Sequence, residues 1–295
     1  MALAQRLQLA VGRAQYRAIT SVAVRALGLR ARTFEVRGVR MPALVRHRDG
    51  APLVLVHGFG TDKEGWLITA ARLARGRGLV IPDLPGFGGA GDIGPARATA
   101  AAQAAALVGL LDVLGLGRVH LAGSSMGGGV VMRVASDFPG RVASLTLIGS
   151  VGPIIEPSEV VTAIGRGENP LVLSGPDDWD RFMALVAERP PRMTQAMARF
   201  MAHEKALRSL AHEELLRAWV AAGDDGPPEA LESIHTPALI IHGARDRVIH
   251  VSTAHALAER LPRARLEVLD RVGHAPQAEA PRRLARLIEA HLARH

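Results

Sequence analysis

A serine between two glycines is the residue of this sequence best suited to nucleophilic chemistry. Ser125 lies at the centre of Gly123–Gly127 (GSSMG), directly after the apolar run Val119–Ala122 and directly before a stretch of helical composition. This G-x-S-x-G spacing is typical of a strained strand-to-helix turn that exposes the serine hydroxyl above a sheet. Side chains two residues to either side would collide there, so both positions require glycine. The alternative is a glycine-rich turn in which the serine only caps a helix.

The serine hydroxyl is a weak nucleophile and needs a base that is itself oriented by an acid. In a parallel α/β sheet these partners are expected at the carboxyl ends of later strands, the acid before the histidine. Asp246 and His274 each lie just past an apolar, strand-like run and occur in that order. The sequence therefore predicts a catalytic triad of Ser125, Asp246 and His274, with Asp270 as the alternative acid.

Acyl transfer also needs two preorganised N–H donors for the oxyanion of the tetrahedral intermediate. One is expected from Met126, the residue after the serine. The second is expected from the loop His57–Gly60 (HGFG), which follows an early strand-like run and whose glycines permit a tight turn. The predicted oxyanion hole therefore consists of the backbone N–H groups of Phe59 and Met126.

Alternating strand-like and helical segments must position these residues. The apolar run Pro52–His57 is typical of a strand buried on both faces, and five later runs repeat its character. Two segments before it, 33–39 and 41–46, have the pattern of edge strands. Helical stretches separate the later runs, at 98–114, 128–137, 252–261 and 281–293. The pattern predicts an α/β fold, with a mostly parallel central sheet, right-handed crossovers and helices on both faces.

One segment interrupts this alternation. Residues 153–233 contain no run typical of a buried strand and are expected to form a helical cap, inserted after the sixth strand. Four of its residues recur at helical spacing on one face: Met193, Met197, Phe200 and Met201. This face is expected either to be the packing core of the cap or to line an apolar acyl site, because flexible thioethers adapt to chains of variable shape.

Five short motifs, HGFG, DLPGFG, GSSMGG, GARD and GH, occur in this order over about residues 50–292. In these motifs the chain resembles the α/β-hydrolase fold superfamily. The segments HGFGTDKEGW and GSSMGGGVV and the stretch 190–201 are similar to the monoacylglycerol lipase/esterase branch, which includes bacterial lipases. The resemblance implies Ser125 as nucleophile, Asp246 as orienting acid and His274 as base. Members of this branch often carry an N-terminal membrane anchor, whereas the N-terminal apolar runs here are too interrupted to span a bilayer.

Composition and charge exclude several other classes of protein. Of 295 residues, 48% are hydrophobic, which supplies a large core, and the absence of cysteine excludes disulfides, thiolate metal sites and a cysteine nucleophile. The net charge of +8 is local, because residues 1–48 hold ten arginines and one acid. The ten aromatic residues are too few and too scattered for stacking on single strands, so no nucleic-acid partner is expected.

The N-terminal stretch combines apolar and basic residues. At about 100° per residue, one helical face holds Leu3, Leu7, Val11, Ala14, Ala18 and Val22. Arginines lie on a neighbouring face and interrupt every candidate signal-peptide core, so a secretory signal is not expected. Two interpretations remain open: a helix that packs on the outside of the domain, or an amphipathic helix that lies on an anionic membrane surface.

These expectations divide the chain into an N-terminal extension (1–32), two parts of an α/β-hydrolase core (33–152 and 234–295) and the cap (153–233). We expect a serine hydrolase that cleaves carboxylic esters, monoacylglycerol among them, through an acyl-enzyme intermediate and without a metal or organic cofactor. The alternatives are a carbon–carbon bond hydrolase of the same fold, a cofactor-free perhydrolase and a non-catalytic binding scaffold. The expected location is the cytoplasm, with peripheral contact between the N-terminal extension and the inner face of the membrane.

Overall fold

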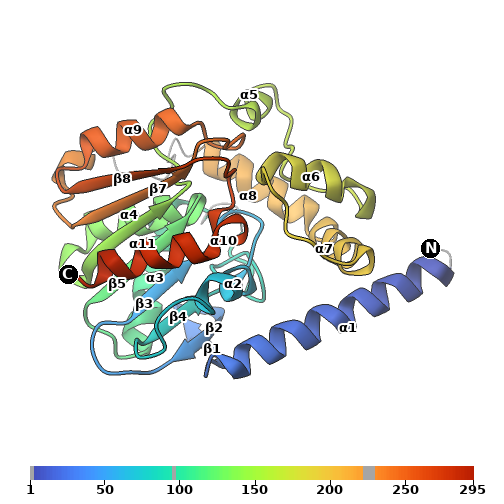
Figure 1. The fold of residues 1–295 in the computed structure, drawn as a ribbon, viewed down its shortest axis with the longest axis horizontal. Helices are drawn as coiled ribbons and strands as arrows, with labels where there is room; N and C mark the ends of the chain where they lie inside the picture. The colour runs from blue at the N-terminus through green and yellow to red at the C-terminus, as the bar shows by residue number, and fades with distance from the viewer. Residues whose placement is uncertain (1–2, 95–97, 222–229) are drawn as a thin grey trace.

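An eight-stranded sheet forms the centre of the protein (Figure 1). The computed structural model describes residues 3–94, 98–221 and 230–295. The strands lie in the order β1-β2-β4-β3-β5-β6-β7-β8; β2 is antiparallel to β1 and β4, and the other neighbouring pairs are parallel. From β1 to β8 the strands span Arg30–Val36, Val39–Arg46, Leu53–Val56, Leu79–Pro82, Val119–Ser124, Val142–Ile148, Ala238–Gly243 and Ala264–Leu269. This sheet confirms the predicted fold class.

Helices cover both faces of the sheet. Successive side chains of a strand point to opposite faces, so Val54 and Val56 of β3 enter one hydrophobic cluster and Leu53 and Leu55 enter the other. The helices on the first face are α3 (Ala100–Val113), α4 (Met126–Asp137) and α9 (Val251–Arg260). Those on the second are α2 (Leu67–Ala70) and α11 (Pro281–Leu292), which follows the short α10 (Pro276–Glu279). Burial on both faces explains why β3 to β7 read as continuous apolar runs.

The hairpin at the sheet edge begins three residues earlier than the sequence pattern predicts. β1 starts at Arg30 rather than Thr33, and the turn to β2 is made by Arg37 and Gly38, with φ of 51° and 78°. Positive φ at both positions matches the strand twist of a two-residue hairpin, but Arg-Gly is not the Asn-Gly or Asp-Gly pair that signals such a turn. Most of β1 is exposed on both faces, so no apolar alternation marks its start.

Between β6 and β7 the described residues form four α-helices. They are α5 (Glu159–Gly165), α6 (Trp179–Val186), α7 (Gln195–Ala206) and α8 (Ser209–Ala221). Ser158 and Thr194 cap α5 and α7, each accepting a hydrogen bond from the backbone N–H three residues on. Part of this segment has a hydrophobic cluster of its own, which includes Trp179 and Phe182 of α6. The division of the chain into extension, core and cap remains a prediction.

A long N-terminal helix, α1 (Leu3–Ala26), lies outside the sheet and packs along α7 (Figure 1). Gly12 makes this approach possible, because a Cβ there would lie 2.0 Å from the Ala196 carbonyl oxygen. The rings of Tyr16 and Phe200 are 5.7 Å apart between centroids, and the Thr194 hydroxyl donates to the Gln15 side chain. None of the described helices is both long enough and apolar enough to cross a membrane. The contacts with α7 show that one face of α1 packs on the outside of the domain.

Candidate functional site

Ser125 occupies the turn between β5 and α4 with an unusual backbone conformation. Its φ of 56° and ψ of −122° lie where residues with a side chain rarely fall. Such a conformation is unfavourable by about 1–3 kcal/mol and persists only where the surroundings enforce it. Here the Ser125 N–H donates to the Ile148 carbonyl of β6 at 2.9 Å, and its own carbonyl accepts from Gly128 N–H at 2.8 Å.

The glycines around Ser125 are required by close backbone contacts. A Cβ on Gly123 would lie 2.2 Å from the Gly127 carbonyl oxygen, and a Cβ on Gly127 would lie 2.4 Å from the His57 carbonyl oxygen. Both distances are far below van der Waals contact with backbone atoms that cannot rotate away. The collision predicted from the G-x-S-x-G spacing is therefore confirmed, and α4 starts at Met126, two residues before the predicted start.

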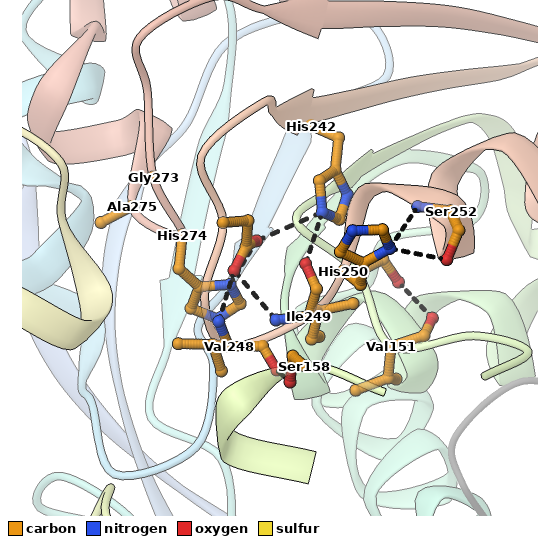
Figure 2. Close-up of polar contacts among 12 residues, drawn as sticks. Val151, Ser158, His242, Val248, Ile249, His250, Ser252, Gly273, His274 and Ala275 are labelled. Atoms are coloured by element: carbon orange, nitrogen blue, oxygen red, sulfur yellow. Dashed lines mark hydrogen bonds and ion pairs between the residues drawn. The ribbon is translucent and has the colours of Figure 1, made fainter. Parts of the chain in front are cut away.

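A buried carboxylate holds His274 at the carboxyl end of the neighbouring strands. Asp246 follows β7 and is buried, and its Oδ2 lies 2.8 Å from His274 Nδ1. Figure 2 shows His274 near His242 and Ile249. The backbone N–H groups of Val248 and Ile249 donate to the other carboxylate oxygen at 2.8 and 2.9 Å. His242 Nε2 is 3.2 Å from Oδ2 and 2.9 Å from the Ile249 carbonyl, so this nitrogen faces two acceptors and carries a proton.

These donors determine the charge of Asp246. Burial alone would raise the pKa of this carboxyl group. Electrostatic attraction to His274 and the hydrogen bonds from His242 and His274 outweigh burial and hold the pKa of Asp246 well below its ordinary value. Asp246 is therefore a carboxylate at neutral pH and keeps the proton of His274 on Nδ1, which leaves Nε2 free to accept one. Asp270, the alternative acid, is an exposed residue beyond β8.

The triad candidates lie at the carboxyl ends of neighbouring strands. Gly149, directly after β6, is so close to the Asp246–His274 pair that a Cβ there would lie 3.3 Å from His274 Nδ1 and 3.4 Å from Asp246 Oδ2. The residue before it, Ile148, accepts the hydrogen bond from Ser125 N–H. The structure thus joins Asp246 to His274 directly and places Ser125 at the adjacent strand end.

The predicted oxyanion loop lies against the serine turn. A Cβ on Gly58 would lie 3.0 Å from Ser125 Cβ and 3.1 Å from the Ser124 carbonyl oxygen. His57 fastens this loop, because its Nδ1–H donates to the Gly58 carbonyl and its Nε2 accepts from Leu84 N–H, both at 2.9 Å. Burial lowers the pKa of His57, which keeps the ring neutral and both hydrogen bonds intact. Phe59 and Met126 both line the cavity described next.

Two residues of the inserted helices brace the oxyanion loop, and sequence reasoning did not single them out. Lys205 of α7 donates from Nζ to the Gly60 carbonyl and lies 5.0 Å from the centroid of the Phe182 ring. His212 of α8 packs its ring against Phe59, with the centroids 5.7 Å apart. One signal was available for the first of them, since Lys205 is one of only two lysines in a chain rich in arginine.

An apolar cavity of about 330 Å³ opens beside Ser125. Side chains from α5, α8 and the loop after β7 supply most of its wall, including Val160, Ile164, Leu215, Trp219, Val248 and Ile249. Its only described lining residues with an ionisable acid or base are Glu156 and His250, and no described lysine or arginine lines it. The cavity is therefore suited to an uncharged, apolar group next to the serine hydroxyl.

The methionine face of the cap lies elsewhere. Met193 and Met201 pack against the cluster around Trp179 and Phe182, and Phe200 contacts Tyr16 of α1. Neither these three residues nor Met197 is among the described residues that line the cavity beside Ser125. These contacts favour the first interpretation of this face, in which it is the packing core of the cap. The geometry gives no support to the second, in which the face lines an acyl site.

Comparison with known proteins agrees with this geometry. The chain matches the Alpha/beta hydrolase family over residues 53–287. It is 30% identical to Lipase 3 of Moraxella sp. (strain TA144), over 78% of this chain and 74% of the lipase. It is 32% identical to the 2-hydroxy-6-oxo-2,4-heptadienoate hydrolase of Pseudomonas putida (strain ATCC 700007 / DSM 6899 / JCM 31910 / BCRC 17059 / LMG 24140 / F1), over 83% of this chain and 90% of that hydrolase.

A solved structure of a membrane phospholipase A, described as a bacterial virulence factor, superposes with a TM-score of 0.89 at 29% identity, covering 96% of this chain and 92% of the other. The family match, the sheet order and the serine turn define one class of protein. The chain belongs to the α/β-hydrolase family and is a hydrolase of that fold. Its relatives include both lipases and hydrolases of carbon–carbon bonds.

The buried ring of His212 predicts a stability change at mildly acidic pH. Burial, with Lys205 and Arg208 nearby, lowers the pKa of His212 from 6.5 to about 4. The unfolded chain therefore binds a proton between about pH 6.5 and 4 that the folded chain does not, so acidification through this window destabilises the fold. The free energy of unfolding of the wild-type chain is expected to fall between pH 7 and pH 4.5. In His212→Gln we expect this fall to be smaller by on the order of 1–3 kcal/mol. Urea unfolding at a series of pH values measures it.

The same substitution at His255 is the matched control, because that side chain is exposed on α9. We expect His255→Gln to leave the slope of stability against pH as it is in the wild-type chain. If the unfolding free energies of wild type and His212→Gln had the same slope against pH, the proton uptake would occur at another group.

Proposed function

We propose that this protein is a serine hydrolase that cleaves carboxylic esters of apolar acyl groups, with lipids and monoacylglycerol among its substrates. The observation that carries the proposal is the apolar cavity that opens at Ser125 and has no described lysine or arginine in its wall. The paired Asp246 and His274 and the strained serine turn support an activated nucleophile at the mouth of that cavity. Similarity to a lipase and to a phospholipase A supports the substrate class.

In the proposed mechanism Ser125 Oγ attacks the ester carbonyl while His274 Nε2 takes its proton. The Nδ1–H bond to Asp246 holds the imidazole in the tautomer that this step requires. Negative charge then develops on the carbonyl oxygen, and the N–H groups of Met126 and Phe59 stabilise it. His274 returns the proton to the leaving alcohol, and water, activated by the same histidine, hydrolyses the acyl-enzyme. Substrate and water are the only reactants.

The cavity wall distinguishes this proposal from the second candidate, a carbon–carbon bond hydrolase. A dienoate substrate carries a carboxylate, and burial of that charge needs a cationic partner or several donors. The cavity wall has no described lysine or arginine to pair with that carboxylate, and its histidine, His250, already faces Ser252 Oγ at 2.9 Å and Glu156 at 3.8 Å. A neutral acyl chain needs no such partner. The same argument favours esters of long or medium chains over small polar acids.

A lipid substrate also supports a peripheral position at the inner face of a membrane, with the N-terminal extension as the contacting segment. This part of the proposal is separate from the chemistry at Ser125, because α1 contributes no described residue to the cavity.

The role of the buried acid can be tested by a charge-neutral substitution. We expect Asp246→Asn to lower kcat by about four orders of magnitude, because the amide no longer holds the proton of His274 on Nδ1. Steady-state hydrolysis of p-nitrophenyl butyrate measures the loss, and thermal unfolding verifies that the variant is folded. The matched control is Asp270→Asn, which changes an exposed acid of the same type and is expected to retain full activity. If Asp270→Asn alone lost activity, the acid that orients the catalytic histidine would be Asp270 and not Asp246.

A substrate panel tests the proposed reaction. We expect kcat/KM to rise along p-nitrophenyl esters from acetate to octanoate by at least tenfold, because each added methylene is buried in the apolar cavity. Hydrolysis of 1-monoacylglycerol is expected in the same assay series, with a 2-hydroxy-6-oxo-dienoate as the competing substrate. Faster turnover of the dienoate than of every ester would favour the carbon–carbon hydrolase and contradict the ester proposal.

A further inference from the structure

The outer face of α1 exposes apolar side chains to an extent that no packing contact explains. Leu3, Leu7, Val11 and Val22 are 84%, 65%, 43% and 64% exposed. With two small residues between them, Ala14 and Ala18, they form one continuous face, which we call the outer stripe. Contiguous exposed apolar surface is uncommon on a protein without a partner.

Positive charge lies beside this stripe. Arg6, Arg13 and Arg17 are exposed on the adjoining face, and Arg25 lies in the last turn. α1 contains no acidic residue, and the first acid of the chain is Glu35. A helix with an apolar face and arginines along its flank has the composition of helices that lie in the interface of an anionic bilayer.

The opposite face fixes the stripe in its outward orientation. Gly12 and Tyr16 pack on α7, and Ala23 and Val24 pack on the hydrophobic cluster of the sheet face that α2 and α11 cover. The helix is therefore attached near its middle and at its C-terminal end, with its N-terminal end pointing away from the sheet (Figure 1). The stripe is already formed and oriented in the isolated chain, so binding requires no folding of this segment.

We infer that α1 is a docking helix that lays its outer stripe into the surface of an anionic phospholipid bilayer, an inference that rests on the peripheral membrane contact proposed above. The leucine and valine side chains would lie at the boundary between headgroups and acyl chains, and the arginines would pair with lipid phosphates. With 24 residues the helix is about 36 Å long, so its stripe can lie flat along the interface over most of that length.

Charge argues against a second copy of this chain as the occupant. Two outer stripes in contact would bring together eight arginines of the two helices with no acid on either helix. An anionic lipid surface supplies both the apolar layer and the compensating charge. Docking would also place α7 close to the membrane, and with it Lys205, which contacts the oxyanion loop.

The absence of cysteine allows a direct test. Val11→Cys, in the full chain, introduces a single thiol that can be labelled with the environment-sensitive dye NBD. We expect its emission to shift to the blue with vesicles of phosphatidylcholine and phosphatidylglycerol, and not with phosphatidylcholine alone. Val113→Cys is the matched control, because Val113 is 53% exposed at the end of α3, far from α1 in sequence and on another helix. The control is expected to show no shift.

Two double variants separate the apolar and the electrostatic contributions in vesicle co-sedimentation. Leu7→Asp with Val11→Asp is expected to abolish binding, because carboxylates cannot enter the apolar layer. Arg13→Gln with Arg17→Gln is expected to weaken binding about 25-fold, since each arginine near an anionic surface contributes about fivefold. Both variants are expected to hydrolyse p-nitrophenyl butyrate at the wild-type rate and to unfold at the wild-type temperature.

Three results would overturn the inference. The first is an unchanged emission of the Val11→Cys label on anionic vesicles. The second is binding that neither double variant reduces. The third is a wild-type dimer that Leu7→Asp with Val11→Asp converts to a monomer, which would make the stripe a contact between copies. None of these readouts requires turnover. Membrane docking can therefore fail while the proposed hydrolase activity holds, and the hydrolase activity can fail while docking holds.

Discussion

The strained backbone of Ser125 is the constraint on which the surrounding structure depends. A positive φ at a residue with a side chain is unfavourable, and here the turn is closed by backbone contacts on three sides. Gly123 lies against Gly127, Gly127 lies against His57, and Gly58 lies against Ser125 itself. The same contacts that enforce the strain therefore bring the predicted oxyanion loop to the serine. In the proposed mechanism this turn would hold the nucleophile and the two N–H donors in place before the substrate binds.

Most of the fold and the triad candidates could be predicted because buried strands and tight turns leave local signals. Burial on both faces makes β3 to β7 continuous apolar runs, and the collision of glycines around Ser125 depends only on residues within the motif. Asp246 and His274 could be placed because residues just past parallel strands meet at one edge. Their contact at 2.8 Å follows from the order of β7 and β8 in the sheet.

What could not be predicted depends on contacts between segments far apart in the chain. The cavity wall comes from α5, α8 and the loop after β7, and the meeting of these segments leaves no periodic pattern in the sequence. The face of Met193, Phe200 and Met201 does have a helical period, but Phe200 packs against α1 and the two methionines pack against the cluster of α6. Lys205 binds Gly60 across 145 positions in sequence, and Lys63 binds the buried Asp83 at 2.7 Å. Lys205 thus holds the predicted oxyanion loop and Lys63 holds the segment directly after it, and both contacts are visible only in the folded chain. The hairpin boundary at Arg30 escaped detection because exposed β1 carries no alternation.

The central claim is that Ser125 is an activated nucleophile, and covalent labelling with a fluorophosphonate tests it most directly. Intact mass spectrometry followed by peptide mapping should find one adduct per chain, on Ser125, and none in Ser125→Ala. The neighbouring Ser124, which ends β5 and is buried, provides the control, since Ser124→Ala should still be labelled at position 125. An adduct on another residue, or a folded wild-type chain that does not react, would contradict the account.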